Sequence, residues 1–191
     1  MRKIFTKEEE EKRKRRNQFV VGGILIFVMV FSVLGYSLNS GNNNTNEQIN
    51  YNGFTFTKNS GLWYLNKDNL NFSFSYSPQE VNIINSSLNN INNYTGKPLY
   101  IYSESDEALT EIYRNLFYEN GIVQRMQNAC PEGQNCSGDI PIKSCDNNFI
   151  IIKDSNETEI KQQENCVFIE GKNENLTQIS DSFLYKIIGI Q

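Results

Sequence analysis

The chain has 191 residues, of which 38% are hydrophobic and 21% charged, with a formal net charge of −4 and no histidine. This length allows at most one ordinary domain plus an appendage. Catalytic Ser–His and Cys–His pairs and histidine-ligated metal sites need an imidazole, so they are excluded among these residues. The chain contains 28 asparagines and only two alanines, which argues against a mostly helical fold because alanine is the best helix former.

The stub formed by residues 1–18 has a net charge of +4. Five consecutive basic residues lie near its end: Lys12, Arg13, Lys14, Arg15 and Arg16. By the positive-inside rule, we expect the N-terminus in the cytoplasm and the C-terminal domain outside the cell membrane. Glutamates stand four residues before the first four of these basic residues, so a helix is expected to begin near Lys7 and to continue through Leu38.

An uncharged apolar stretch at residues 19–38 predicts a transmembrane helix. Twenty helical residues rise about 30 Å, which matches the hydrocarbon core of a bilayer. A cleaved secretory signal is the competing interpretation, but its apolar region is usually only about 7 to 15 residues long. A pilin-like filament subunit, cleaved before Phe19 and packed through the same helix, is a further alternative.

Residues 39–50 are polar and rich in Gly and Asn, which predicts a flexible tether. Residues 51–191 form the expected extracytoplasmic domain, with a net charge of −7. This acidic balance argues against nucleic acid as a partner, because phosphate binding needs a basic surface.

Apolar residues alternate with polar ones, or form short runs, at residues 54–56, 62–65 and 72–76. This pattern predicts a three-strand meander with one buried face. Ser77 is then followed by Pro78 and, three residues on, by Glu80. That combination of an N-cap, a first-turn proline and a capping glutamate predicts a helix from Pro78 to about Asn93.

Residues 99–102 form an apolar run that is typical of a central strand. Ser105 is expected to cap a second helix, for which Asn120 and Gly121 form a suitable C-terminal end. Residues 122–126 fit either a strand or an extension of that helical region.

Two buried strands are predicted at residues 149–152 and 167–169, on either side of a polar excursion through residues 159–161. A closing helix is expected over residues 175–188. Strands come first and helices intersperse later, which predicts an α+β fold with helices packed against a largely antiparallel sheet.

All four cysteines lie in the expected outer domain: Cys130, Cys136, Cys145 and Cys166. An oxidising compartment would make them disulfides. Four cysteines permit three connectivities, and we favour Cys130 with Cys136 and Cys145 with Cys166, the latter joining the entrances of two strands. A zinc site of four thiolates is the weaker interpretation, because zinc ligands usually come in tight C-x2-C pairs.

Seven N-x-[ST] sequences are candidate glycosylation acceptors, where about 3.5 would arise by chance from this composition. They are Asn43, Asn71, Asn85, Asn93, Asn135, Asn156 and Asn175. This twofold excess favours a glycosylated outer surface only weakly.

The densest group of carboxylates lies where a strand is expected to lead into a helix: Glu104, Asp106, Glu107 and Glu111. One interpretation is a cation site or an acid–base pair. We favour the other, that acids at a helix N-terminus complement its dipole. We therefore assign no catalytic residue, no metal site and no cofactor.

Three stretches carry a resemblance to a group of proteins: DIPIKSCDNNFIIIKDS, NCVFIEG and SDSFLYKIIGI. They resemble segments of small membrane-anchored proteins encoded by archaea with reduced genomes, a group with no known activity. The resemblance covers most of the outer domain. It implies a one-helix anchor and a cysteine-bearing outer domain, and no mechanism.

We expect a non-enzymatic protein of the cell envelope, in which a single-pass anchor presents a disulfide-stapled binding or accessory module. Its partner would be another envelope protein or a glycan. The alternatives are a membrane-tethered hydrolase that uses the carboxylates at residues 104–111, and the pilin-like subunit.

Overall fold

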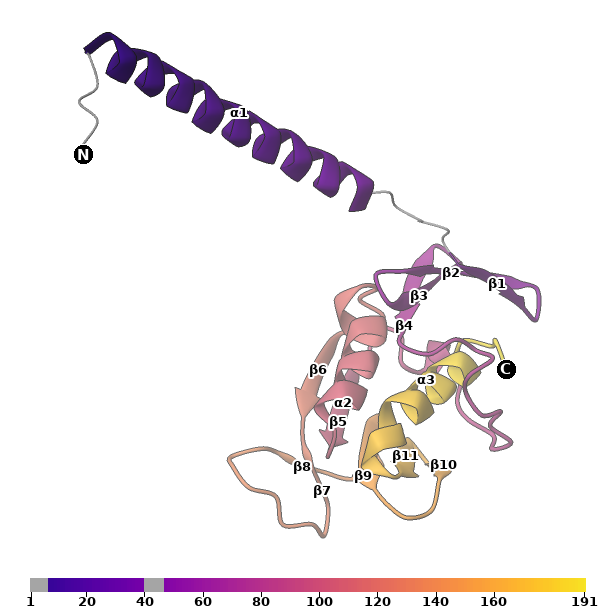
Figure 1. Ribbon diagram of the computed structural model, residues 1–191. Helices are drawn as coiled ribbons and strands as arrows, with labels where there is room; N and C mark the ends of the chain where they lie inside the picture. Colours follow the sequence, from indigo (N-terminus) through magenta and orange to yellow (C-terminus); the bar gives the residue numbers. More distant parts are fainter. Residues whose placement is uncertain (1–6, 40–46) are drawn as a thin grey trace. The chain divides into compact units, whose positions relative to one another are not determined.

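The computed structural model describes residues 7–39 and 47–191 (Figure 1). The chain divides into two units, residues 1–45 and 46–191, and each is described by itself. In the first unit, α1 (Lys7–Asn39) is one continuous helix, as expected. Its segment Lys14–Ser32 is long and apolar enough to cross a membrane, and none of that segment is buried. Such a helix is compatible with a membrane anchor or with a secretion signal.

The second unit begins with an antiparallel meander of β1 (Gln48–Tyr51), β2 (Phe54–Asn59), β3 (Leu62–Lys67) and β4 (Leu70–Phe74). The three predicted strands are confirmed. β1 is a correction, because residues 48–50 were expected to belong to the tether, of which residues 40–46 lie outside the described residues. Its Ile49 pairs with Phe56 and packs against the core, so β1 follows the alternation of a sheet with one buried face.

The three hairpins of the meander turn through two residues each. Both turn residues have positive φ at Asn52–Gly53 (47° and 84°), Ser60–Gly61 (50° and 87°) and Asp68–Asn69 (54° and 63°). This is the type I′ geometry, whose twist matches that of the strands, and Asn, Asp and Gly adopt it most readily. The turn residues therefore determine the register of the whole sheet.

The second sheet has the strand order β10-β11-β9-β5-β6. Its strands are β5 (Pro98–Ser103), β6 (Arg125–Asn128), β9 (Phe149–Asp154), β10 (Glu159–Gln163) and β11 (Cys166–Gly171). Only β10 and β11 pair antiparallel, whereas the other three pairs are parallel. A short parallel pair, β7 (Cys130–Pro131) and β8 (Ile142–Lys143), lies beside this sheet.

The α+β class is confirmed, but the expectation of a largely antiparallel sheet holds only for the meander. The reason is visible in β9, where Phe149 to Ile152 are all buried, as is typical of parallel strands covered on both faces. The expected strands at 99–102, 149–152 and 167–169 are confirmed, and residues 125–128 form a strand. The polar excursion at residues 159–161 is the edge strand β10, with Ile160 buried.

Two helices pack against each other and against the second sheet (Figure 1). α2 (Asp106–Tyr113) begins after Ser105, whose side chain accepts a hydrogen bond from the Ala108 N–H at 3.3 Å. It continues as a π-helical turn, η2 (Arg114–Tyr118). α3 (Leu176–Ile187) follows the short η3 (Asn173–Asn175) and ends before Gly189, whose φ is +74°. Both predicted helices are thus confirmed.

The helix predicted from Pro78 to Asn93 is wrong, and only η1 (Ile91–Asn93) is helical there. The capping signal does form locally, since the Ser77 N–H donates to Glu80 Oε2 at 2.7 Å. Asn, Ser and Ile are weak helix formers, and this stretch has few others. Its polar groups instead bond to other elements: Lys186 Nζ donates to the Ile84 carbonyl at 3.1 Å, and Ser86 Oγ donates to the Ile160 carbonyl.

Side chains from η2 and from the turn that follows it form hydrogen bonds to the outer edge of β4. The Ser73 N–H donates to Asn115 Oδ1 at 2.8 Å, and Asn115 Nδ2 donates back to the Ser73 carbonyl at 2.7 Å. Asn120 repeats this exchange with the N–H and carbonyl of Asn71, at 2.9 and 2.8 Å. Each carboxamide therefore takes the place of a peptide group in a neighbouring strand.

The π-helical turn brings the two asparagines to the same side. The Glu119 N–H bonds to the Arg114 carbonyl, five residues earlier, at 3.0 Å. Asn115 and Asn120 are also five residues apart, so they repeat on one face of a π turn. On β4, alternate residues face the same edge, which matches the carboxamides to Asn71 and Ser73.

Replacement of Asn115 by alanine should destabilise the second unit by about 2 to 4 kcal/mol, because Ser73 and Asn115 are both fully buried and two backbone groups would lose their partners. The full-length chain in neutral detergent would be unfolded with urea. Asn66→Ala is the matched control: it removes an exposed carboxamide that bonds to the Asn71 side chain at 2.7 Å, and should change stability by less than about 0.5 kcal/mol. Equal losses of stability in the two variants would contradict a stabilising role for the hydrogen bonds between Asn115 and Ser73.

Candidate functional site

The predicted carboxylate group does not converge. Glu104, Asp106 and Glu107 are exposed around the N-terminus of α2, whereas Glu111 lies on the buried side of the helix with 2% exposure. Glu104 accepts the Asp154 N–H at 2.9 Å, and Glu107 accepts the Ser105 hydroxyl at 3.2 Å. Within residues 7–39 and 47–191, no three His, Cys, Asp or Glu side chains are placed to hold a metal ion. Asp106 and Glu107 lie in the first turn of α2, where their charges complement the helix dipole.

Glu111 instead belongs to a buried polar cluster with Asp181 of α3, which sequence reasoning did not single out. Arg114 pairs with one carboxylate oxygen of Glu111, and the Ser75 hydroxyl donates to the other. Asp181 is fully buried, and its Oδ2 accepts the Tyr76 N–H at 2.9 Å. The Tyr185 hydroxyl donates to the Tyr76 carbonyl at 2.6 Å. The cluster joins the end of the meander to both helices.

Burial raises the pKa of Asp181 well above its ordinary value, and the nearby charge of Glu111 raises it further. The hydrogen bond from Tyr76 and the positive charge of Arg114 oppose this rise less strongly. Asp181 therefore keeps a proton at pH values where an exposed aspartate has lost it. Its Oδ1 has no hydrogen-bond partner among the described residues. The only signal in the sequence is an aspartate within the apolar pattern of the closing helix.

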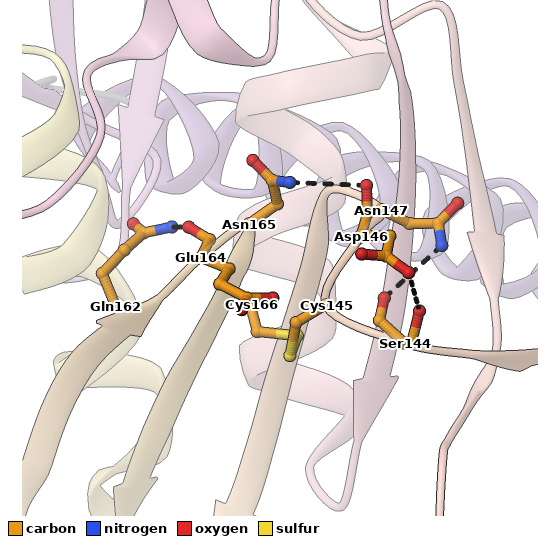
Figure 2. The surroundings of a disulfide bond; sticks show 8 residues. All are labelled: Ser144, Cys145, Asp146, Asn147, Gln162, Glu164, Asn165 and Cys166. Atoms are coloured by element: carbon orange, nitrogen blue, oxygen red, sulfur yellow. Dashed lines mark hydrogen bonds between the residues drawn. A yellow bond between two sulfur atoms is a disulfide. The ribbon is translucent and has the colours of Figure 1, made fainter.

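Both favoured disulfides are confirmed, with Cα–Cα distances of 5.9 Å for Cys130–Cys136 and 4.9 Å for Cys145–Cys166. No cysteine is free in the described parts of the chain. Figure 2 shows Cys145 bonded to Cys166 at the entrance of β11. Beside it, Asn165 Nδ2 donates to the Asp146 carbonyl at 3.3 Å, and the Asn165 N–H donates to the Cys145 carbonyl at 3.2 Å. The second disulfide thus ties the segment before β9 to β11.

Six of the seven candidate glycosylation acceptors lie in the described residues, and Asn43 lies outside them. The exposed acceptors are Asn71, Asn85, Asn93, Asn135 and Asn156. Asn175 is half-buried at the end of η3. Their use as acceptors stays a prediction.

A groove runs along β6 between α2 and the segment that follows the first disulfide. Its larger part is a cavity of about 610 Å³, lined by Leu109 and Tyr113 of α2, Met126 and Asn128 of β6, and residues 139–141 among others. A second cavity of about 390 Å³ shares Leu109, Asn128 and Ile140 with it, and extends to Asp106 and Cys136. We call these two cavities together the β6 groove.

The β6 groove combines an apolar lining with a free strand edge. Leu109, Met126, Ile140 and Pro141 provide aliphatic surface, and the ring of Tyr113 is 41% exposed. β6 is the last strand of its sheet and pairs only with β5. The arrangement is suited to binding a chain segment rather than to proton or group transfer. The polar residues on either side of Met126 could have indicated an edge strand, but not the groove beside it.

No protein-family model matches the chain, and no curated protein or solved structure matches it at a significant level.

Replacement of Asp181 by asparagine should remove part of the pH dependence of stability. Folding raises the pKa of Asp181. The contribution of Asp181 to stability is therefore fully present at pH values below its pKa in the unfolded chain, and it is lost as pH rises through its pKa in the folded chain. Asparagine keeps the acceptor for the Tyr76 N–H and never loses a proton. The free energy of unfolding of Asp181→Asn should therefore fall less between pH 4 and pH 9 than that of the unchanged chain.

The matched control for this measurement is Asp139→Asn, an exposed carboxylate, which should leave the pH profile as it is. Identical pH profiles for the unchanged chain and Asp181→Asn would contradict a proton held at Asp181.

Proposed function

We propose that the protein is a single-pass membrane-anchored module of the cell envelope, which holds residues 46–191 outside the cytoplasm and binds another envelope protein there. It acts by binding rather than by catalysis. The observation that carries the proposal is the β6 groove, an apolar surface beside a free strand edge, on the unit that contains both disulfides.

The location rests on three features that agree with one another. α1 contains an apolar segment long enough to cross a bilayer. The basic residues precede that segment, which supports an N-terminus in the cytoplasm by the positive-inside rule. Both disulfides lie in the unit after the helix, and disulfides persist mainly in oxidising compartments.

The lining of the β6 groove favours a protein over a glycan as the partner. Its larger cavity contains four aliphatic residues and one aromatic residue, Tyr113. An aliphatic surface gains most by covering apolar side chains of a partner protein. The free edge of β6 also offers main-chain hydrogen bonds, which an extended polypeptide can match along its whole length.

A membrane-impermeant amine reagent applied to intact cells should label Lys97 and Lys172, which are exposed on the second unit. Lys12 and Lys14 should react only after the cells are lysed, because the proposed orientation places them in the cytoplasm. Peptide mass spectrometry of the purified chain measures all four sites at once, so that each pair is the control for the other. Labelling of Lys12 and Lys14 in intact cells, with Lys97 and Lys172 protected, would reverse the orientation.

A photoreactive side chain at Thr110, which is exposed and lines the groove, should crosslink the full-length chain to a discrete envelope protein in the native membrane. The same side chain at Glu157, exposed in the turn between β9 and β10, is the matched control and should give no such adduct. Gel analysis after irradiation compares the two positions. Equal adducts at both positions, or none at Thr110, would remove the groove from the proposal.

A further inference from the structure

The backbone of β6 presents two residues with unused hydrogen-bonding groups toward the β6 groove. The ladder between β5 and β6 pairs Pro98 to Ile101 with Arg125 to Asn128, and the Ala129 N–H donates to the Ile101 carbonyl at 2.9 Å. In a parallel ladder, alternate residues turn their N–H and C=O groups to opposite sides. The backbone N–H and C=O groups of residues 125, 127 and 129 therefore point toward β5, and those of Met126 and Asn128 point away from the sheet.

The chain itself uses the next position on this same edge. The Cys130 N–H, which faces outward like that of Asn128, donates to the Pro141 carbonyl at 2.9 Å. β8 then pairs parallel with β7 at Cys130 and Pro131. A short strand is thus already added to the outer edge at Cys130. Within the described part of the chain, the two outward-facing residues before it, Met126 and Asn128, have no strand beside them on that edge. Among the described residues, none bonds to the outward backbone groups of Met126 and Asn128.

The charged residues that line the β6 groove are both acidic. Asp139 lines its larger cavity and Asp106 its smaller one, and both side chains are exposed. Of the residues that the structure describes, no lysine or arginine lines either cavity. Residues 51–191 carry a net charge of −7. Arg125 of β6 and Lys143 of β8 contact the Tyr100 side chain and are not among the residues that line the two cavities. An approaching segment with positive charge is therefore attracted, and an acidic one is repelled.

We propose that the β6 groove binds a basic, extended peptide segment of a partner protein, which adds to β6 as a further strand. Its backbone bonds to Met126 and Asn128, its apolar side chains cover Leu109 and Ile140, and its lysines or arginines lie near Asp106 and Asp139. This inference rests on the proposed function and states the chemistry by which that partner is recognised.

A pair of synthetic peptides tests the charge and the extended backbone. The probe is a fluorescent octapeptide of alternating Lys and Val, and its counterpart alternates Glu and Val. Binding to the full-length chain in neutral detergent is followed by fluorescence anisotropy. The basic peptide should bind at least tenfold more tightly than the acidic one, and the difference should shrink as salt is raised.

Proline at position 128 tests the strand edge. Asn128→Pro removes an N–H that faces outward, so the ladder to β5 stays intact and the fold is retained, as for proline on other edge strands. It should weaken binding of the basic peptide about tenfold, whereas the matched control Asn128→Ala, which keeps the N–H, should bind like the unchanged chain. Asp106→Asn combined with Asp139→Asn should remove most of the preference for the basic peptide.

Near-ultraviolet circular dichroism of each variant checks that the fold is unchanged. Equal binding to Asn128→Pro and Asn128→Ala would overturn strand addition, as would equal binding of the two peptides by the unchanged chain. If the chain with a photoreactive side chain at Thr110 still crosslinks to an envelope protein in that case, the proposed function stands and only the strand-adding basic segment is wrong.

Discussion

The second unit depends on how the outer edge of β4 is hydrogen-bonded. A strand edge covered by helices loses contact with water, and its N–H and C=O groups then need partners within the protein. Asn115 and Asn120 provide them at Ser73 and Asn71, and Asp181 accepts the N–H of Tyr76, which follows the strand. Asn115 belongs to η2, Asn120 to the turn after it and Asp181 to α3, which packs against β9 and β11 of the second sheet. The same bonds therefore close the meander and attach it to the helices, so that residues of both sheets share one apolar core.

The hydrogen-bonded side chains along the edge of β4 lie next to the Glu111–Asp181 cluster, in which two carboxyl groups are close together inside the protein. Two neighbouring negative charges in a buried site repel each other strongly, so one of them retains its proton. Glu111 is paired with Arg114. Asp181 is fully buried beside that carboxylate, and its burial, together with the nearby Glu111, raises its pKa. A network of this kind stabilises one arrangement of strands and helices only while all its members are bonded.

The edges of the two sheets differ in a way that bears on function. The outer edge of β4 is hydrogen-bonded to the carboxamide side chains of Asn115 and Asn120. On β10, the exposed Glu159 forms an ion pair with Lys161 at 3.1 Å. Charged side chains on an edge strand discourage the addition of another strand. β6 carries exposed Arg125 at its start, but among the described residues no group bonds to the outward N–H and C=O groups of Met126 and Asn128. Residues 135–137, at the end of the first disulfide loop, and residues 139–141 form the far wall of its groove. An open strand edge beside an apolar groove is suited to binding an extended chain segment.

The sequence by itself determined the features that depend on neighbouring residues. The apolar run of α1, three strands of the meander and the Ser105 cap could be predicted, and the observed cysteine pairing was the favoured one of three that the sequence allows. Local signals failed where distant parts of the chain competed. The stretch after Pro78 has a helix cap, but its polar groups bond to β10 and α3. The parallel pairing of β5, β6 and β9, the meeting of Glu111 with Asp181, and the open edge at Met126 and Asn128 were decided only by the tertiary structure. Each joins residues that are far apart in the chain, and the pattern of apolar and polar residues carries no information about which strand becomes a neighbour.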